Sequence, residues 1–242
     1  MKEAAKEIKE GKFVVALTGA GISTESGIPD FRSKNGLWSK YDINEYGYLD
    51  SFLRNPKKVW KMIADMISSF GKSNPNAAHY TLAEMEKMHI LKAVITQNID
   101  NLHQEAGSKN VVELHGNYRR LTCMSCRKKY GIEEISLEML PPRCKCNGII
   151  KPDIVFFGET LPKDALIKAF DLINKCDVML VIGTSCVVSP AAELPVIAKQ
   201  NGATIIEINM EDSMISHIVD YKLQGKAGEI LPKLLNEIKN LL

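Results

Sequence analysis

The chain has 242 residues, of which 45% are hydrophobic and 25% charged, and its formal net charge is +2 at pH 7. This composition is typical of a globular protein with one large domain, or with one domain and a small insert. The charge is too small to predict a nucleic-acid partner or a membrane surface, and no oligomer is predicted. Residues 1–11 are a charged segment unlike a signal peptide, and no apolar run reaches the roughly 18 residues of a membrane span. We therefore expect a cytoplasmic protein.

Short apolar, β-branched runs alternate with helical patterns along most of the chain. Strands are expected at Phe13–Leu17, Ala93–Thr96, Val111–Leu114, Val178–Ile182 and Thr204–Ile208. Helices are expected at Pro56–Phe70, Ala77–Met88, Pro162–Lys175, Pro190–Asn201 and Glu229–Leu242. Strands that are apolar throughout are typical of sheets covered on both faces. The pattern predicts an α/β fold with a doubly wound, mainly parallel, Rossmann-like sheet.

Two segments interrupt this alternation. Residues 118–152 are rich in Arg, Lys, Cys and Pro, and contain only a short possible helix at Ile132–Leu140. We interpret them as a small inserted module between the two halves, 1–117 and 153–242, of one discontinuous domain. Residues 33–55 have no clear periodicity, and long loops in compact domains usually carry function. They are expected to form a flexible cofactor-binding loop or lid, or part of a second small subdomain, and 33–70 a loop and helical subdomain.

Glycine-containing turns follow two of the predicted strands. Gly19-Ala20-Gly21 follows the first, where glycines would allow close approach of the backbone to a pyrophosphate. The third glycine of the dinucleotide fingerprint is replaced by Thr24, so a tight turn that binds nothing is the alternative. Gly183-Thr184-Ser185 forms a second polar turn. Asn209, which closes another strand, would bond a ribose hydroxyl or simply form a turn.

Polar side chains also follow the strands at Ala93–Thr96 and Val111–Leu114. The first is followed by Gln97-Asn98-Ile99-Asp100, and the second by His115 and Gly116. Ligands of open α/β sheets bind at the carboxyl ends of strands. A neutral imidazole there can accept a proton from a hydroxyl. The alternatives are helix capping for Asn98 or Asp100 and a structural role for His115. The other histidines, His79, His89, His103 and His217, are interpreted as structural.

Four of the six cysteines lie in two pairs, Cys123 and Cys126 followed by Cys144 and Cys146. Four thiolates at such spacing match a tetrahedral structural zinc site with no open position for catalysis. The alternative is four unligated thiols in an insert that would then lack a core. Cys176 and Cys186 flank an apolar strand, where a small buried role is expected.

The run Pro152-Asp153-Ile154-Val155-Phe156-Phe157-Gly158-Glu159 follows the insert. It is apolar and resembles a strand that ends in Gly-Glu. The pattern fits a core strand, and it equally fits an edge to which an extended peptide adds a strand.

Together these motifs resemble the sirtuins of bacterial or archaeal type, which are NAD-dependent protein-lysine deacetylases. The resemblance runs from about Phe13 to Leu231. It is carried by Gly19-Ala20-Gly21-Ile22-Ser23, Gly27-Ile28-Pro29-Asp30-Phe31-Arg32, Thr96-Gln97-Asn98-Ile99-Asp100, Leu114-His115-Gly116, Phe157-Gly158-Glu159, Gly183-Thr184-Ser185 and Gly225-Lys226-Ala227-Gly228. The single residue between Cys144 and Cys146 departs from the commoner spacing of two.

The resemblance implies that NAD is a co-substrate and that one structural zinc ion is bound. Residues expected to contact NAD are Gly19, Ala20, Gly21, Ser23, Thr24, Asp30, Phe31, Arg32, Gln97, Asn98, Ile99, Asp100, Gly183, Thr184, Ser185, Asn209 and Ala227. Among these, Asn98, Ile99 and Asp100 would form the nicotinamide pocket. Catalysis is expected from Asn98, Asp100 and His115, with His115 as general base on a ribose hydroxyl. The products would be nicotinamide, O-acetyl-ADP-ribose and free lysine.

The resemblance also implies that acetylated proteins or peptides bind as an added strand between Val155–Glu159 and Val187–Ala191. Substrate contacts are expected from Val155, Phe157, Gly158, Glu159 and Val188. Ile63 and Met66 stand where family members that prefer acidic acyl groups carry tyrosine and arginine. They are expected to form an apolar wall of the acyl pocket that favours neutral acyl groups, and the alternative is that both simply pack in the core. Alternatives are an NAD-dependent protein ADP-ribosyltransferase, a deacylase of longer neutral acyl groups, and a non-catalytic NAD-sensing module.

Overall fold

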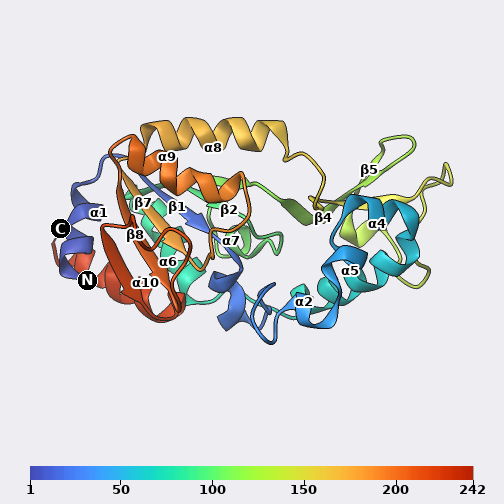
Figure 1. Cartoon of the computed structure of the whole chain (residues 1–242), viewed down its shortest axis with the longest axis horizontal. Coiled ribbons are helices and arrows are strands. Elements are labelled where there is room, and N and C mark those ends of the chain that lie inside the picture. The colour runs from blue at the N-terminus through green and yellow to red at the C-terminus, as the bar shows by residue number, and fades with distance from the viewer. Residues whose placement is uncertain (242) are drawn as a thin grey trace.

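The computed structural model describes residues 1–241, and its larger lobe is built on a six-stranded parallel sheet (Figure 1). The strands lie in the order β3-β2-β1-β7-β8-β9. Their bounds are β1 Val14–Thr18, β2 Leu91–Thr96, β3 Val111–Glu113, β7 Val178–Ile182, β8 Thr204–Asn209 and β9 Tyr221–Gln224. Chain order reverses between β1 and β7, and this reversal is the point at which Rossmann-like sheets bind their ligands. The predicted fold class is therefore confirmed.

The five predicted strands agree with the structure to within two residues, whereas β9 was not predicted. All five residues of both β1 and β7 are buried, which is why each is a continuous apolar run. β9 has the sequence Tyr-Lys-Leu-Gln and lies at the sheet edge, half-buried and exposed in turn. A four-residue edge strand of this kind gives too weak an apolar signal to predict.

Helices cover both faces of the large sheet, as Figure 1 shows. One face packs against α1 (Lys2–Glu10), α6 (Ala77–Lys87) and α10 (Ala227–Lys239), and the other against α8 (Lys163–Lys175) and α9 (Leu194–Gln200). The predicted end of the last helix, Leu242, lies outside the described residues. None of the helices within residues 1–241 has the length and hydrophobicity needed to cross a membrane.

A smaller lobe combines two segments that are far apart in the sequence. Its antiparallel sheet consists of β4 (Gly116–Cys123), β5 (Lys129–Gly131) and β6 (Ile150–Ile154). Its helices are α2 (Leu37–Lys40), α3 (Ile43–Tyr46), α4 (Leu49–Arg54) and α5 (Pro56–Phe70). The indole nitrogen of Trp60 in α5 donates a 2.9 Å hydrogen bond to the Ile150 carbonyl in β6, and both residues belong to one hydrophobic core. We propose that this lobe is inserted into one discontinuous Rossmann-like domain.

One expectation for the smaller lobe was wrong. The possible helix over Ile132–Leu140 is a single 3-10 turn at Ile132–Glu134, and an irregular segment follows it. Ile135, Leu137 and Leu140 pack against the core of the small lobe from this segment, so their apolar spacing reflects packing and no helical period. Residues 33–55, expected as a loop, a lid or part of a small subdomain, contain the three short helices α2, α3 and α4.

Candidate active site

A cavity of about 1020 Å³ opens where the carboxyl ends of β1 and β7 face the small lobe. Most residues predicted to bind NAD or substrate line it: Gly19, Ala20, Gly21, Thr24, Asp30, Phe31, Arg32, Gln97, Asn98, Ile99, His115, Val155, Phe157, Gly158, Glu159, Gly183, Thr184, Ser185, Val188, Asn209 and Ala227. Ser23 and Asp100 instead line an adjoining cavity of about 460 Å³. The two cavities share Asn98 and Ile99, so they meet at the loop that follows β2.

The glycine turn after β1 packs against the turn after β7. Gly19 and Gly21 donate backbone hydrogen bonds to the carbonyls of Ile182 (3.0 Å) and Gly183 (2.8 Å). A Cβ on Gly21 would lie 2.8 Å from the Gly183 backbone, and one on Gly183 only 2.4 Å from the Ile22 nitrogen. The glycines therefore bring the two turns into contact. The N–H groups of Gly19 and Gly21 are both used within the protein, so donors for an anion must come from other residues.

The donors that face the cavity come from neighbouring residues. Within residues 1–241, the backbone N–H groups of Ala20, Thr184 and Ser185 have no hydrogen-bond partner, and all three residues line the cavity. The Thr184 side chain is held by the Gln97 amide at 2.9 Å. The Thr184 carbonyl accepts a 2.9 Å bond from the Asn209 amide. Three free amides and a cavity of this volume fit the diphosphate of a dinucleotide.

A buried polar network holds the loop after β2. The Asn98 side-chain amide donates to the Gly19 carbonyl at 3.1 Å and to the Ser23 hydroxyl at 3.2 Å. Ser23 donates to the Asp100 carboxylate at 2.6 Å, and the Leu102 N–H donates to the other carboxylate oxygen at 3.0 Å. Burial raises the pKa of Asp100, opposed by these two hydrogen bonds. The network fixes the Asn98 nitrogen toward the protein, which leaves its carbonyl oxygen for a ligand.

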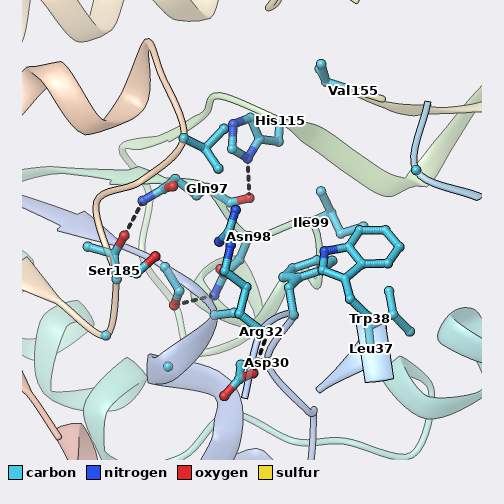
Figure 2. Close-up of a pocket in the computed structure, with 18 of the residues that line it drawn as sticks. Asp30, Arg32, Leu37, Trp38, Gln97, Asn98, Ile99, His115, Val155 and Ser185 are labelled. Carbon is cyan, nitrogen blue, oxygen red and sulfur yellow. Dashed lines mark hydrogen bonds between the residues drawn. The ribbon is translucent and has the colours of Figure 1, made fainter. Parts of the chain in front are cut away.

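The His115 ring lines the cavity from the turn between β3 and β4, on the opposite side of Asn98 from Arg32 (Figure 2). Its Nδ1 lies 2.9 Å from the Gln97 carbonyl oxygen. Because a carbonyl can only accept, Nδ1 carries the hydrogen and Nε2 carries the lone pair in the neutral ring. Burial lowers the pKa of His115, opposed by the bond to Gln97. The ring is therefore neutral at pH 7 and can accept a proton at Nε2.

The segment Asp30-Phe31-Arg32 forms a turn at the edge of the cavity (Figure 2). The half-exposed Asp30 carboxylate accepts the N–H groups of Arg32 at 3.0 Å and Ser33 at 2.8 Å. The ring centroids of Phe31 and Trp38 lie 5.8 Å apart. Asp30 thus shapes the turn through its own backbone contacts, and Arg32 is exposed where it can meet an anion.

The segment expected to bind peptide follows β6 and is partly paired already. The Phe157 N–H donates to the Gly47 carbonyl at 2.9 Å, and its carbonyl accepts the Leu49 N–H at 3.0 Å. The Glu159 carboxylate is neutralised by Lys151 at 3.0 Å and accepts the Phe156 N–H at 2.8 Å. The Glu159 N–H also donates to the Phe156 carbonyl at 3.0 Å. Within residues 1–241, Gly158 is therefore the residue of the segment Phe156–Glu159 whose N–H and carbonyl both remain available for an added strand.

The four paired cysteines converge in the small lobe. Their Sγ atoms all lie within 4.8 Å of one another, and two pairs, Cys123–Cys146 and Cys126–Cys144, are 3.5 Å apart. Tetrahedral zinc with bonds of about 2.3 Å requires sulfur atoms about 3.8 Å apart, so the four thiols fit this ion. All four positions would be occupied by protein ligands, which fits a structural role. Cys176 and Cys186 are buried in the core, as expected.

Several apolar residues line the cavity without having been predicted. Leu37, Trp38 and Met62 come from the segment 33–70, and Met66 also lies there, as expected. Ile63 was expected beside Met66 but is 2% exposed and packs in the core of the small lobe. Met62 and Met66 are four residues apart on α5 and share the face that borders the cavity, so Ile63 lies on the face that packs against the core. A helical period alone did not show which face of α5 meets the site.

Comparison with known proteins places the chain in a family. Residues 19–190 match the model of the Sir2 family. The chain is 50% identical over 247 residues to an NAD-dependent protein deacylase of Pyrococcus furiosus, covering 99% of this chain and 98% of the relative. A crystal structure of a Sir2 homologue–NAD complex is 45% identical with a TM-score of 0.93, covering 100% of this chain and 94% of the other. A Sir2 variant with a deacetylated p53 peptide and 3'-O-acetyl-ADP-ribose is 41% identical with a TM-score of 0.94, covering 98% of each chain. The chain therefore belongs to the Sir2 family.

Proposed function

We propose that this protein removes acetyl groups from lysine side chains of proteins with NAD as co-substrate. The products would be nicotinamide, O-acetyl-ADP-ribose and the free lysine. The observation that carries the proposal is the placement of His115, a ring with an unprotonated Nε2 that lines the same cavity as Asn98 of the Asn98–Ser23–Asp100 network. A general base and a polar pocket for an amide leaving group then belong to one site.

NAD would occupy the large cavity. The free N–H groups of Ala20, Thr184 and Ser185 would bind its diphosphate, with Arg32 at the exposed edge. Asn98, Ile99 and Asp100 would enclose the nicotinamide in the adjoining cavity. Bound NAD would supply a nicotinamide leaving group and ribose hydroxyls. The remaining predicted contacts, including Gly19, Gly21, Thr24, Gln97, Gly183, Asn209 and Ala227, would shape the walls of this site.

Asn98, Asp100 and His115 would have different roles in the reaction. Asn98 and Asp100 would hold the nicotinamide end so that the acyl-lysine oxygen meets the ribose carbon in line, and such positioning supplies much of the acceleration for a weak nucleophile. His115 would accept a proton from a ribose hydroxyl at Nε2. Phe157 and Val155 would contact the acyl-lysine side chain and exclude water from it. The four cysteines would hold zinc and keep the small lobe folded.

The substrate would be an acetylated peptide in extended conformation, bound between Gly158 and Val187. Within residues 1–241 the backbone groups of Gly158 and Val187 make no hydrogen bonds, and both residues are solvent-accessible. Strand addition there would read the backbone of the peptide more than its side chains. We also propose a cytoplasmic location, because the four clustered cysteines are free thiols suited to a metal ion, as is typical of proteins in a reducing compartment.

The test is incubation with NAD and an acetylated peptide, followed by mass spectrometry. Deacetylated peptide and O-acetyl-ADP-ribose in equal amounts are expected, and both should be missing with the His115→Ala variant. Label from NAD that stays attached to protein, without O-acetyl-ADP-ribose, would indicate the alternative ADP-ribosyltransferase. Binding of NAD with neither product would indicate a non-catalytic NAD-sensing module.

A further inference from the structure

Two buried histidines lie behind the loop that carries Asn98 and Asp100. His79 comes from α6 and His103 from α7 (Leu102–Glu105), and their side chains are 0% and 1% exposed. The ring centroids are 4.9 Å apart with an interplanar angle of 63°, an edge-to-face arrangement. Neither ring lines the two cavities. Their influence on the site must therefore pass through other residues.

His103 is connected to the backbone of Asn98. Its Nε2 lies 2.9 Å from the Thr18 hydroxyl, which donates a 2.8 Å bond to the Thr96 hydroxyl. The Asn98 N–H donates to the same Thr96 oxygen at 3.0 Å. Because the Thr18 hydrogen is committed to Thr96, the His103 Nε2 must carry a hydrogen and donate it to Thr18. These three hydrogen bonds link the His103 ring to the backbone nitrogen of Asn98.

His79 is connected to the side chain of Asn98. Its Nδ1 accepts the Asn76 N–H at 3.2 Å, so Nε2 carries the hydrogen and points at the Ser23 hydroxyl, 3.5 Å away. Ser23 accepts the Asn98 amide at 3.2 Å and donates to Asp100 at 2.6 Å. One series of hydrogen bonds therefore holds the backbone of Asn98 and the other holds its side-chain amide. In both series the histidine donates from Nε2.

In the described part of the chain, the Nδ1 atom of His103 makes no contact that would explain a polar ring at this buried position. Within residues 1–241, the Nδ1 of His103 is buried without a hydrogen-bond partner. An unpaired buried polar atom destabilises the folded state, whereas an apolar ring of similar size would fill the same space without that cost. The imidazole is thus better explained by the bond that its Nε2 makes than by packing alone. Burial lowers the pKa of His103 well below its ordinary value, and that of His79 to about 4, so both rings are neutral donors at pH 7.

We propose that His103, paired with His79, is a positioning residue that fixes Asn98 for cleavage of nicotinamide from NAD. The proposal rests on the function proposed above. His103 sets the backbone of Asn98 through Thr18 and Thr96, and His79 sets its amide through Ser23. Loss of the His103 bond lets the loop shift, so the leaving group and the ribose carbon lose their alignment. Binding of the peptide, on the far side of the cavity, is unaffected.

Three variants separate positioning from packing. His103→Phe keeps an aromatic ring against His79 and removes the donor. His103→Gln places an amide nitrogen near the position of Nε2 and restores it. Thr18→Val removes the same bond from its other end in nearly the same volume. His217→Gln, at an exposed histidine, is the control.

The readouts are kcat, the KM for acetylated peptide and exchange of labelled nicotinamide into NAD. His103→Phe and Thr18→Val should lower kcat and exchange together, by up to about 100-fold, with an unchanged peptide KM. His103→Gln should recover most of the loss. Should His103→Phe fail to fold, Thr18→Val decides alone. Wild-type kcat in both, or losses in His103→Gln that equal those in His103→Phe, would overturn the proposal.

A second measurement does not depend on turnover. The backbone amide resonance of Asn98 should shift in His103→Phe and Thr18→Val and stay near its wild-type position in His103→Gln. An inactive wild-type protein would reject the proposed deacetylation, whereas this resonance would still report whether His103 sets Asn98. An Asn98 resonance that is identical in all three variants would overturn the positioning role whatever the activity.

Discussion

The Nδ1 atom of His115 lies 2.9 Å from the carbonyl oxygen of Gln97, and this contact determines which nitrogen of the ring can act as a base. Gln97 belongs to the same loop as Asn98 and also holds Thr184 through its side chain. The orientation of the general base, the nicotinamide pocket and the turn after β7 are therefore set by neighbouring atoms of one loop.

Replacement of His115 with Ala should abolish deacetylation while the fold and NAD affinity change little. Removal of a general base typically lowers the rate by about 10²- to 10⁴-fold. His115 is half-buried and its ring makes one hydrogen bond, so little stability depends on it. The measurement is kcat with an acetylated peptide, together with NAD binding by calorimetry. Near wild-type turnover would remove His115 from the mechanism.

Stability should fall as the solution is made acidic because His79 is buried in its neutral form. Burial lowers its pKa in the folded protein to about 4, below the value of about 6.5 expected for the unfolded chain. Between these values the unfolded state binds more protons, so lower pH favours unfolding. The contribution of His79 amounts to about 2 kcal/mol between pH 7.5 and pH 5.

Guanidinium unfolding of wild type and His79→Gln at both pH values measures this contribution. The variant should lose less stability on acidification than the wild type, and the exposed His217→Gln control should behave like the wild type. The same pH dependence in His79→Gln as in wild type would show that the ring is not held neutral by the fold.

Removal of zinc should unfold the small lobe and lower activity indirectly. Cys123 and Cys144 are buried in the core of that lobe, and a structural ion contributes folding free energy. Cys123→Ser or Cys144→Ser should lower the zinc content and the melting temperature. Cys176→Ser, a buried cysteine outside the cluster, should keep stoichiometric zinc. Fully active protein without zinc would contradict the assignment of these ligands.

High nicotinamide should inhibit by reversing the first step of the reaction. The adjoining cavity of about 460 Å³, lined by Asn98, Ile99 and Asp100, can hold nicotinamide while the reaction intermediate occupies the large cavity. Inhibition should therefore be noncompetitive with NAD, and labelled nicotinamide should exchange into NAD. Strictly competitive inhibition with no exchange would argue against a separate pocket.

Acetyl-lysine should be a better substrate than succinyl-lysine on the same peptide. Met62 and Met66 line the cavity from α5, and the residues around them include Leu37 and Trp38. These four largely apolar side chains offer a carboxylate no charge in place of its hydration, so kcat/KM should be at least about 10-fold lower. Met66→Arg should raise the ratio of succinyl to acetyl removal, and Met66→Leu should not. Faster succinyl removal by the wild type would contradict this account.

Much of the architecture follows from short-range patterns in the sequence. β1 and β7 are buried on both faces, so each is a run of apolar residues that can be recognised without any partner. The polar motifs after the strands at Asn98 and His115 follow from the rule that parallel strands end at one edge of a sheet. The spacing of Cys123 and Cys126, and of Cys144 and Cys146, is likewise local.

The tertiary structure decided which distant residues meet. Ser23 and Asp100, 77 positions apart, are in contact because β1 and β2 are neighbours in the sheet, and no local pattern contains that pairing. Trp60 joins α5 to β6 and so makes one lobe of two segments that look independent in the sequence. His103 resembles any core histidine until its bond to Thr18 is seen. Periodicity reports which side of an element is buried, whereas the identity of the partner depends on how the elements pack.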